Sequence, residues 1–351
     1  MKKNLVDTVI YFVPVEPKYF DRWEYYRVDL KMLKETHNKV FIAHTFFSFF
    51  KLVITNKINL VYFWWWHSSI FIILFSKLLR IPVIGTGAVH MFDESGALDF
   101  YKKSFLFRFF NRVAWVLSDK ILFISESQDR QITSHEKVKS SYVLKSASIN
   151  SKEELLNLSK GKKPNEVIQL MTVCWLTKDQ ILRKSIDKII KALSMLPHNN
   201  LKNLKLFIVG GGGDGINYLE SMIRDLNLSE NISIEIDITN ERKNELYKYS
   251  DLYIQPSYYE GFGNSVLEAM SFGTPCLVSS FTAQPEVVLG TGYVINRIHE
   301  VDIYEAILDY SSKNISERQH MIDKVVSTVM NNHSFDSRLL EYKNLINRDL
   351  N

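Results

Sequence analysis

The segment that most constrains the fold of this chain is 252–275. It opens with a short apolar run, 252–255, which Pro256 and Ser257 bring to an end, as expected of a buried strand. After a short loop, apolar residues recur at helical spacing up to Gly273, and a proline stands two residues farther on. The segment therefore predicts a strand, a glycine-containing loop and the start of a helix.

The loop and the first helical turn form a candidate anion site. Backbone N–H groups at the start of a helix have no partner within the helix, so they can bind a phosphate. Glycines also let the backbone approach such a ligand closely. The residues expected to line this site are Gly261, Phe262, Gly263, Asn264 and Ser265.

Two carboxylates flank the candidate anion site. Glu260 precedes the loop, and Glu268 lies in the expected helix. Because a carboxylate repels a phosphate, we expect both groups to accept hydrogen bonds from hydroxyls on either side of a diphosphate. The sugar would lie on one side and the ribose on the other.

Residues 260–280 read Glu-Gly-Phe-Gly-Asn-Ser-Val-Leu-Glu-Ala-Met-Ser-Phe-Gly-Thr-Pro-Cys-Leu-Val-Ser-Ser. This order resembles the Glu-x7-Glu signature of retaining glycosyltransferases with the GT-B fold, family 4, also described as glycosyl transferases group 1. The resemblance implies a transfer from a nucleotide diphosphate-sugar, with Glu260 as a catalytic residue that orients the sugar and Glu268 on the ribose. The alternative is an ordinary strand-to-helix crossover with surface glutamates.

The fold class predicted from the whole chain is α/β. Apolar strands alternate with helical patterns on both sides of a polar stretch, 150–166, which is typical of parallel, doubly wound sheets. The resemblance implies the GT-B arrangement of two Rossmann-like domains that face a central cleft. We expect an acceptor-binding domain over 1–160, a nucleotide-sugar-binding domain over 161–325, and a terminal helix, 326–351, that returns to the first domain.

The residues expected to place cations near the diphosphate match the family pattern at one position and differ from it at another. Relatives carry an Arg just after the strand that ends here at Trp175, and a Lys several residues later, which Lys184 matches. We expect Lys184 to be a catalytic point charge for the leaving diphosphate. Either Lys178 or Arg183 could replace the missing Arg, or backbone amides could suffice. A solvated lysine on a helix face is the alternative reading of Lys184.

Other donor contacts are expected at the ends of two neighbouring strands. A glycine-rich run, 210–215, follows one strand, and its Gly211 and Gly212 would line the donor side. Relatives hold the base through backbone groups at the end of the next strand, which places Ile238 in that role. Asp237 stands where the family has Gly, so the identity of the base cannot be read from the sequence. A mobile surface turn is the alternative for the glycine run.

His90 follows an expected strand, 81–86, and resembles the histidine of the family's first domain, near the donor sugar and the acceptor. We therefore include His90 among the catalytic candidates, with a core or surface histidine as the alternative. His67 has a weaker case for the same edge of the sheet.

The segment 99–117 interleaves aromatic rings with the four cations Lys102, Lys103, Arg108 and Arg112. Such a segment can lie on an anionic membrane, with its cations near the headgroups. The alternative is a helix packed in the core with one solvated face. The most apolar stretch, 61–79, is interrupted by polar residues short of a spanning helix.

Composition narrows the remaining classes of function. The chain has 351 residues, enough for about two domains. Its net charge of +4 fits a membrane surface better than a nucleic-acid partner. Asp7 interrupts the first apolar run, which argues against a signal peptide. Cys174 and Cys276 lie in apolar runs, so we expect buried free thiols and a cytoplasmic setting, with peripheral contact at the inner face of the membrane.

The chain shows no Asp-x-Asp pair at an expected strand end in the cleft, so we expect no metal and no cofactor beyond the nucleotide-sugar donor. The acceptor would be a saccharide, expected to be lipid-linked. Richness in Lys, Asn and Ile fits a bacterial genome of low GC content and the assembly of a surface polysaccharide, such as O-antigen, capsule or exopolysaccharide. Two other functions stay open, a nucleotide-sugar-binding protein without catalysis and a GT-B-fold epimerase.

Overall fold

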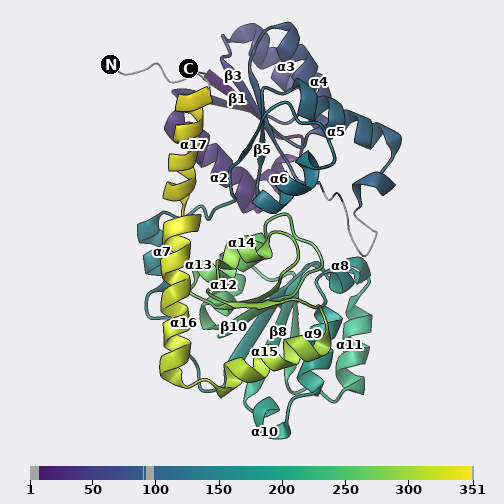
Figure 1. Ribbon diagram of the computed structural model, residues 1–351, viewed down its shortest axis with the longest axis vertical. Helices are drawn as coiled ribbons and strands as arrows, with labels where there is room; N and C mark the ends of the chain where they lie inside the picture. The colour runs from purple at the N-terminus through teal and green to yellow at the C-terminus, as the bar shows by residue number, and fades with distance from the viewer. Residues whose placement is uncertain (1–7, 90, 92–98, 350–351) are drawn as a thin grey trace. The chain divides into compact units, whose positions relative to one another are not determined.

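The computed structural model of the protein describes residues 8–89, 91 and 99–349 (Figure 1). The chain divides into two compact units. Unit 1 comprises residues 1–149 and 334–351, and unit 2 comprises residues 150–333. Each unit has its own parallel sheet of six strands.

The sheet of unit 1 has the strand order β2-β1-β3-β4-β5-β6. Its strands are β1 Thr8–Phe12, β2 Lys39–Ala43, β3 Leu60–Trp64, β4 Val83–Thr86, β5 Lys120–Phe123 and β6 Ser141–Val143. All these strands pair in parallel. Strands such as β1 and β3 are apolar along their length, as expected of strands with helices on both faces.

The helices of unit 1 are α1 Pro17–Arg22, α2 Glu24–Thr36, α3 Phe46–Thr55, α4 Ile70–Leu78, α5 Phe105–Leu117, α6 Glu126–Thr133 and α17 Phe335–Asp349. Right-handed crossovers place α3, α4, α5 and α6 on one face of the sheet and α2 on the other. A core of buried apolar side chains fills the space under the first group, including Phe12, Phe49, Phe63 and Trp115. Helix α17 packs against α2.

A buried ion pair fixes α17 within unit 1. The guanidinium of Arg338 donates from Nη2 to Asp29 Oδ1 at 2.6 Å and from Nη1 to the carbonyl oxygen of Leu144 at 2.8 Å. The other carboxylate oxygen of Asp29 accepts from Tyr62 and Trp64, each at 2.9 Å. Both charges are therefore paired and hydrogen-bonded where water cannot reach them.

The sheet of unit 2 has the strand order β12-β11-β10-β7-β8-β9. Its strands are β7 Ile168–Val173, β8 Leu204–Gly210, β9 Ile232–Ile236, β10 Leu252–Gln255, β11 Cys276–Ser279 and β12 Tyr293–Ile295. All pair in parallel. The chain builds the sheet outward from β7 to β9, then returns to β10 on the other side of β7. The strand order thus reverses between β7 and β10.

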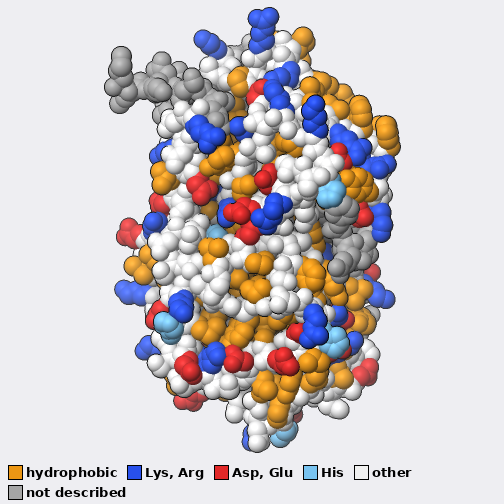
Figure 2. Space-filling model, in the orientation of Figure 1, with side chains coloured by type: hydrophobic (Ala, Val, Ile, Leu, Met, Phe, Trp, Pro, Cys, Tyr) orange, Lys and Arg blue, Asp and Glu red, His pale blue; other side chains and the backbone are white. Residues whose placement is uncertain are grey.

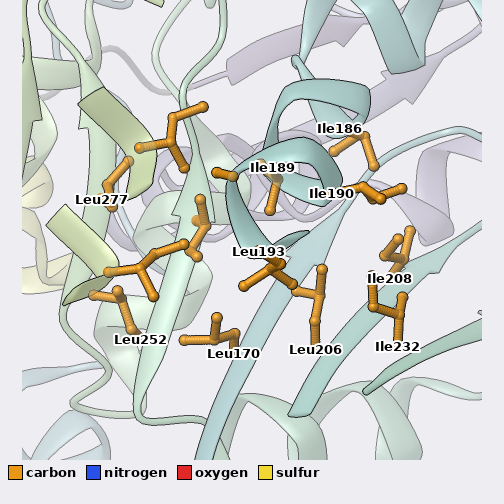
Figure 3. Close-up of a cluster of buried hydrophobic side chains, with 14 of the residues drawn as sticks. Leu170, Ile186, Ile189, Ile190, Leu193, Leu206, Ile208, Ile232, Leu252 and Leu277 are labelled. Atoms are coloured by element: carbon orange, nitrogen blue, oxygen red, sulfur yellow. The ribbon is translucent and has the colours of Figure 1, made fainter. Parts of the chain in front are cut away.

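The helices of unit 2 are α7 Lys152–Ser159, α8 Lys178–Arg183, α9 Ile186–Ser194, α10 His198–Leu201, α11 Ile216–Asp225, α12 Asn240–Tyr249, α13 Asn264–Ser271, α14 Gln284–Val288, α15 Glu300–Ser312 and α16 Ile315–Thr328. A π-helical turn, Val329–His333, ends the unit. The apolar face of α9 packs on the sheet through Ile186, Ile189, Ile190 and Leu193 (Figure 3).

These findings confirm the predicted fold class, α/β with two doubly wound sheets. Cys174 and Cys276 are buried and free, also as predicted. The polar stretch 150–166 is more ordered than a linker, because Ser151 and Glu154 cap α7 in a reciprocal capping box. Leu155 of α7 is buried, but the helix has too few apolar residues for their spacing to predict it from the sequence.

Candidate functional site

The candidate site lies in unit 2 at the carboxyl end of β10, beside β7. Parallel sheets bind ligands at the carboxyl ends of strands where the strand order reverses. The loop after β10 carries Glu260, and the α8–α9 junction after β7 carries Lys184. The fold therefore brings together two segments that are far apart in the sequence.

Glu260 is held through one of its two carboxylate oxygens. Its Oε1 accepts hydrogen bonds from Gln255 Nε2 at 2.9 Å, Ser257 Oγ at 3.1 Å and Arg183 Nη1 at 3.1 Å. Lys184 Nζ lies 3.7 Å from the same oxygen. Among the residues that the structure describes, none bonds to Oε2. That oxygen can accept a hydrogen bond from a ligand hydroxyl.

The charge of Glu260 is stabilised by these neighbours. Burial by itself would raise the pKa of Glu260, but the cations of Arg183 and Lys184 and the hydroxyl of Ser257 bring it below the ordinary value. The carboxylate is therefore ionised at neutral and mildly acidic pH. A carboxylate in this state accepts hydrogen bonds and does not donate a proton.

Gln255, at the end of β10, joins these groups into one network. Its Oε1 accepts from Ser265 Oγ at 2.6 Å, Tyr253 OH at 2.7 Å and Lys184 Nζ at 3.2 Å. With its Nε2 on Glu260, every polar atom of this buried side chain is used. Gln255 was not among the residues predicted from the sequence, although its place directly before the loop could have suggested it.

Lys184 and Arg183 both contact the Glu260 loop. Lys184 Nζ donates to the carbonyl oxygen of Val173 at 3.0 Å as well as to Gln255. Burial lowers the pKa of Lys184, and the charge of Glu260 raises it in part. Arg183 also donates to the carbonyl oxygen of Tyr259 and to the amide oxygen of Gln180. Both predicted cations thus lie at the site, bound to the protein's own oxygens.

The start of α13 follows Glu260 as the loop sequence predicted. Gly263 precedes the helix in a left-handed conformation, with φ of +103°, and as a glycine it has no side chain with which to cap the helix. Within the described part of the chain, the N–H groups of Ser265 and Val266 donate to no acceptor. The ring of Phe262 is buried against His333, with centroids 5.8 Å apart. Phe262 therefore anchors the loop, while the backbone of α13 is available to an anion.

Glu268 lies on α13 and is held from the neighbouring helix α12. Lys243 Nζ lies 2.8 Å from Glu268 Oε2, and Tyr247 OH donates to the same oxygen at 3.1 Å. No described residue bonds to Glu268 Oε1. Glu268 thus repeats the arrangement of Glu260, in which the described residues bind one carboxylate oxygen and not the other. No sequence signal pointed to Lys243, because the packing of α12 against α13 brings it there.

The glycine run after β8 lies under the exposed indole of Trp175. A Cβ on Gly211 would come within 2.2 Å of that ring, and a Cβ on Gly210 would come within 1.7 Å of the Cys174 carbonyl oxygen. Gly212 faces the side chain of Asp237 without crowding it. These glycines therefore permit close packing of this loop on the chain after β7. Trp175 occupies the position where the family pattern has Arg.

Asp237 follows β9 and has a φ of +52°, in the left-handed region. This is a conformation that Gly adopts freely and Asp tolerates, which explains how Asp237 can stand where the family has Gly. Ile238 follows it and is partly buried. Ser185 and Thr282, both next to the Glu260 network, also have positive φ. Residues other than glycine with a positive φ are strained, and such residues are more frequent at functional sites than elsewhere.

The other predicted site residues lie apart from this network. Lys178 is exposed at the start of α8, where its ammonium lies 6.0 Å from the ring centroid of Tyr218. His67, in unit 1, packs its ring 4.4 Å from that of Phe107. His90 lies outside the described residues. Among the described residues, no group of three or more His, Cys, Asp or Glu side chains is placed to hold a metal ion.

Helix α5, within the segment 99–117, has one buried side and one exposed side. Asn111, Ala114 and Trp115 are buried against the sheet, while Phe105 and Phe109 are exposed. In the part of the chain that the structure describes, every helix is too short or too polar to cross a membrane.

Comparison with known proteins shows that part of unit 2 is similar to one protein family. Residues 176–325 match the sequence model of the family described as glycosyl transferases group 1. This span contains Lys184, Glu260 and Glu268 and the other candidates of unit 2. The O-antigen chain mannosyltransferase B of Escherichia coli is 31% identical over 137 residues, which are 39% of this chain and 36% of that protein.

The alpha-galactosylglucosyldiacylglycerol synthase of Streptococcus pneumoniae is 28% identical over 176 residues, 46% of each chain. The chain thus spans less than half the length of these curated relatives. The structure of Anabaena HepE in complex with UDP and glucose has a TM-score of 0.68 and 14% identity, and it covers 97% of this chain and 99% of that one. This likeness shows the GT-B fold.

Proposed function

We propose that the protein is a retaining glycosyltransferase that moves a glycosyl group from a nucleotide diphosphate-sugar to an acceptor hydroxyl. The observation that carries the proposal is Glu260, an ionised carboxylate in the loop before α13, whose Oε2 accepts no hydrogen bond from the described residues. The match of residues 176–325 to glycosyl transferases group 1 supports it, as does the fold shared with a protein that binds UDP and glucose.

Each group has a role in this reaction. When the bond between the sugar carbon and the diphosphate breaks, negative charge grows on the departing nucleoside diphosphate. The N–H groups of Ser265 and Val266 and the ammonium of Lys184 would stabilise that charge. Glu260 would orient the donor sugar through its hydroxyls, and Glu268 would accept from the ribose. His90 stays a prediction for the acceptor side.

The acceptor we propose is a lipid-linked saccharide of bacterial surface polysaccharide assembly, met at the cytoplasmic face of the membrane. Two relatives support this setting by name, one an O-antigen mannosyltransferase and the other a synthase of a diacylglycerol glycolipid. The cations of α5 and of the turn before it would contact anionic lipid there. The donor requires no metal in this proposal, because the α13 amides and Lys184 supply the positive field.

The test is to incubate the protein with a panel of nucleotide diphosphate-sugars and to measure binding as a thermal shift. Release of nucleoside diphosphate and transfer to acceptor are then followed with the donor that binds, and NMR of the product gives the anomeric configuration. Glu260→Gln keeps the size of the side chain and serves as the control, with at least about a hundredfold lower turnover expected. Product of inverted configuration would contradict the retaining mechanism.

A non-catalytic nucleotide-sugar-binding protein is the second candidate, favoured by Trp175 at the position of the family Arg. It predicts a thermal shift without turnover. An epimerase would instead consume the donor without acceptor, so the same assay run with and without acceptor separates the three functions.

A further inference from the structure

Exposed apolar side chains gather on three helices of unit 1. Among the described residues, the five most exposed large apolar side chains all lie on α3, α4 and α5. They are Phe47 at 79%, Leu78 at 77%, Ile54 and Phe105 at 68% each, and Phe71 at 66%. Single exposed apolar residues are normal on a protein surface, but a group of this size marks an interaction site.

The three helices form one continuous surface on the same face of the sheet. Phe75 of α4 contacts three rings of α3, with centroid distances of 6.1 Å to Phe46, 6.3 Å to Phe49 and 5.3 Å to Phe50. Helix α4 also packs against α5, and Figure 1 shows α3, α4 and α5 side by side along one edge of unit 1. We call this surface the α3–α5 face.

The charged residues of α3, α4 and α5 are all cations. The stretches 36–92 and 100–118 contain no Asp or Glu, but they contain nine Lys and Arg residues. Two of these are neutralised by acidic residues outside the stretches, Lys77 by Asp119 at 2.7 Å and Arg112 by Glu136 at 2.6 Å. Within the described part of the chain, Lys51, Lys57, Arg80 and Lys102 make no ion pair. Figure 2 shows cationic and apolar side chains interspersed along this edge.

We propose that the α3–α5 face binds the surface of an anionic lipid bilayer. Its exposed rings and aliphatic side chains would enter the interface, and its unpaired cations would lie at the headgroups. Because no described helix can span a membrane, the face would lie in the plane of the interface. This docking does not depend on glycosyl transfer. It also adds to the cations of α5 an apolar contact, which the exposed side chains of α3 and α4 would make.

The experiment is flotation of the full-length protein with phosphatidylcholine vesicles that contain or lack phosphatidylglycerol, at low and at high salt. An apolar variant carries Phe47→Gln, Ile54→Gln, Phe71→Gln and Leu78→Gln. A cation variant carries Lys51→Gln, Lys57→Gln, Arg80→Gln and Lys102→Gln, which leaves the pairs of Lys77 and Arg112 intact. A matched control carries Leu156→Gln, Tyr249→Gln, Ile315→Gln and Leu340→Gln, four large side chains that are 53–61% exposed and lie off the face.

We expect the parent and the control to bind anionic vesicles at low salt and to keep part of that binding at high salt, because salt screens charges and not apolar contact. The apolar variant should lose at least about tenfold in affinity, including the salt-resistant part. The cation variant should lose the preference for phosphatidylglycerol. Circular dichroism and donor-induced thermal shift, measured on every variant, separate loss of docking from loss of folding or of the donor site.

Three outcomes would overturn the proposal. The first is that the parent binds no vesicles at low salt, and the second is that the apolar variant binds as the control does. Alternatively, light scattering could show that the parent is a dimer that the apolar substitutions dissociate, in which case a second copy covers the α3–α5 face. If an apolar variant with four changes does not fold, the pair Phe47→Gln and Leu78→Gln, the two most exposed positions, gives the same comparison.

Discussion

Glu260 combines burial with a full charge because its cationic and hydroxyl neighbours are fixed before any ligand arrives. Arg183 lies directly before Lys184 in the sequence, and both side chains approach the same carboxylate oxygen. The network through Gln255 and Ser257 keeps that oxygen occupied. A donor sugar would therefore meet a carboxylate whose orientation is already set, which lowers the entropy lost on binding.

The first prediction concerns how the stability that the Arg183–Glu260 ion pair contributes depends on pH. Glu260 has a lowered pKa in the folded protein, so its pairing contributes stability that is complete above the ordinary Glu pKa of about 4.3 and is lost as pH falls through the folded value. Arg183→Met should lower the free energy of unfolding by about 1.5–3 kcal/mol at neutral pH, and by less below about pH 4. Thermal unfolding of both proteins from pH 3 to 7 measures this difference. A difference that does not change with pH would contradict an ion pair between Arg183 and Glu260.

The second prediction tests the ribose contact. Glu268→Gln keeps the shape of the side chain and removes its charge, so a ribose hydroxyl would lose a charged acceptor. We expect donor affinity to fall by about 1.5–3 kcal/mol, measured by calorimetry. Glu245→Gln, an exposed residue on α12, is the control. Unchanged affinity in the Glu268 variant would refute the ribose role.

The third prediction tests Lys184. If its charge stabilises the departing diphosphate, Lys184→Met should lower kcat more than it raises the donor KM, because the negative charge grows only in the transition state. Lys191→Met, on the exposed side of α9, provides the comparison. A rise in KM alone would show that Lys184 binds donor and transition state equally.

At the scale of the element, α13 begins without a side-chain cap, and Gly263 sets the direction of its first N–H groups. A Cβ on Gly263 would meet nothing closer than 3.6 Å, so a substitution there acts through the backbone and not through a clash. Gly290 also has a positive φ, of +75°, and no neighbour within 4 Å, but it lies after α14.

The fourth prediction uses this matched pair. Gly263→Ala and Gly290→Ala should each destabilise the protein by about 1–2 kcal/mol, since both place a Cβ in the left-handed region. Only Gly263→Ala should also weaken donor binding, because relief of the strain would turn the N–H groups of α13 away from the anion. Equal donor affinity in the two variants, measured by calorimetry, would show that the start of α13 does not hold the ligand.

At the scale of the whole molecule, the last helix belongs to the first unit of the chain. The fifth prediction concerns the pair that fixes it there. Arg338→Met should destabilise the protein by about 3–5 kcal/mol, because it leaves the charge of Asp29 buried and unpaired. Asp29→Asn added to that variant should recover part of the loss. Chemical denaturation measures the free energy of unfolding of the single and the double variants. If the losses of the two single variants simply add in the double variant, Arg338 and Asp29 do not stabilise each other.

The sequence by itself determined the alternation of strands and helices and the loop at the centre of the candidate site. Strands such as β10 and β11 are short apolar runs bounded by turn residues, and α13 lies between Gly263 and Gly273, so local pattern was sufficient. The α/β class followed from the alternation of such segments. Glu260 and Glu268 were recognisable because they lie on either side of one glycine-containing loop.

Only the tertiary structure decided which distant residues complete the site and which apolar residues remain exposed. Lys243 reaches Glu268, and Arg338 reaches Asp29, through the packing of helices, which leaves no mark in local sequence. In the same way, the apolar run 61–79 divides into a buried strand and a helix whose outer side is exposed. Periodicity shows that a helix is apolar, but whether another element covers that face depends on the arrangement of the whole sheet.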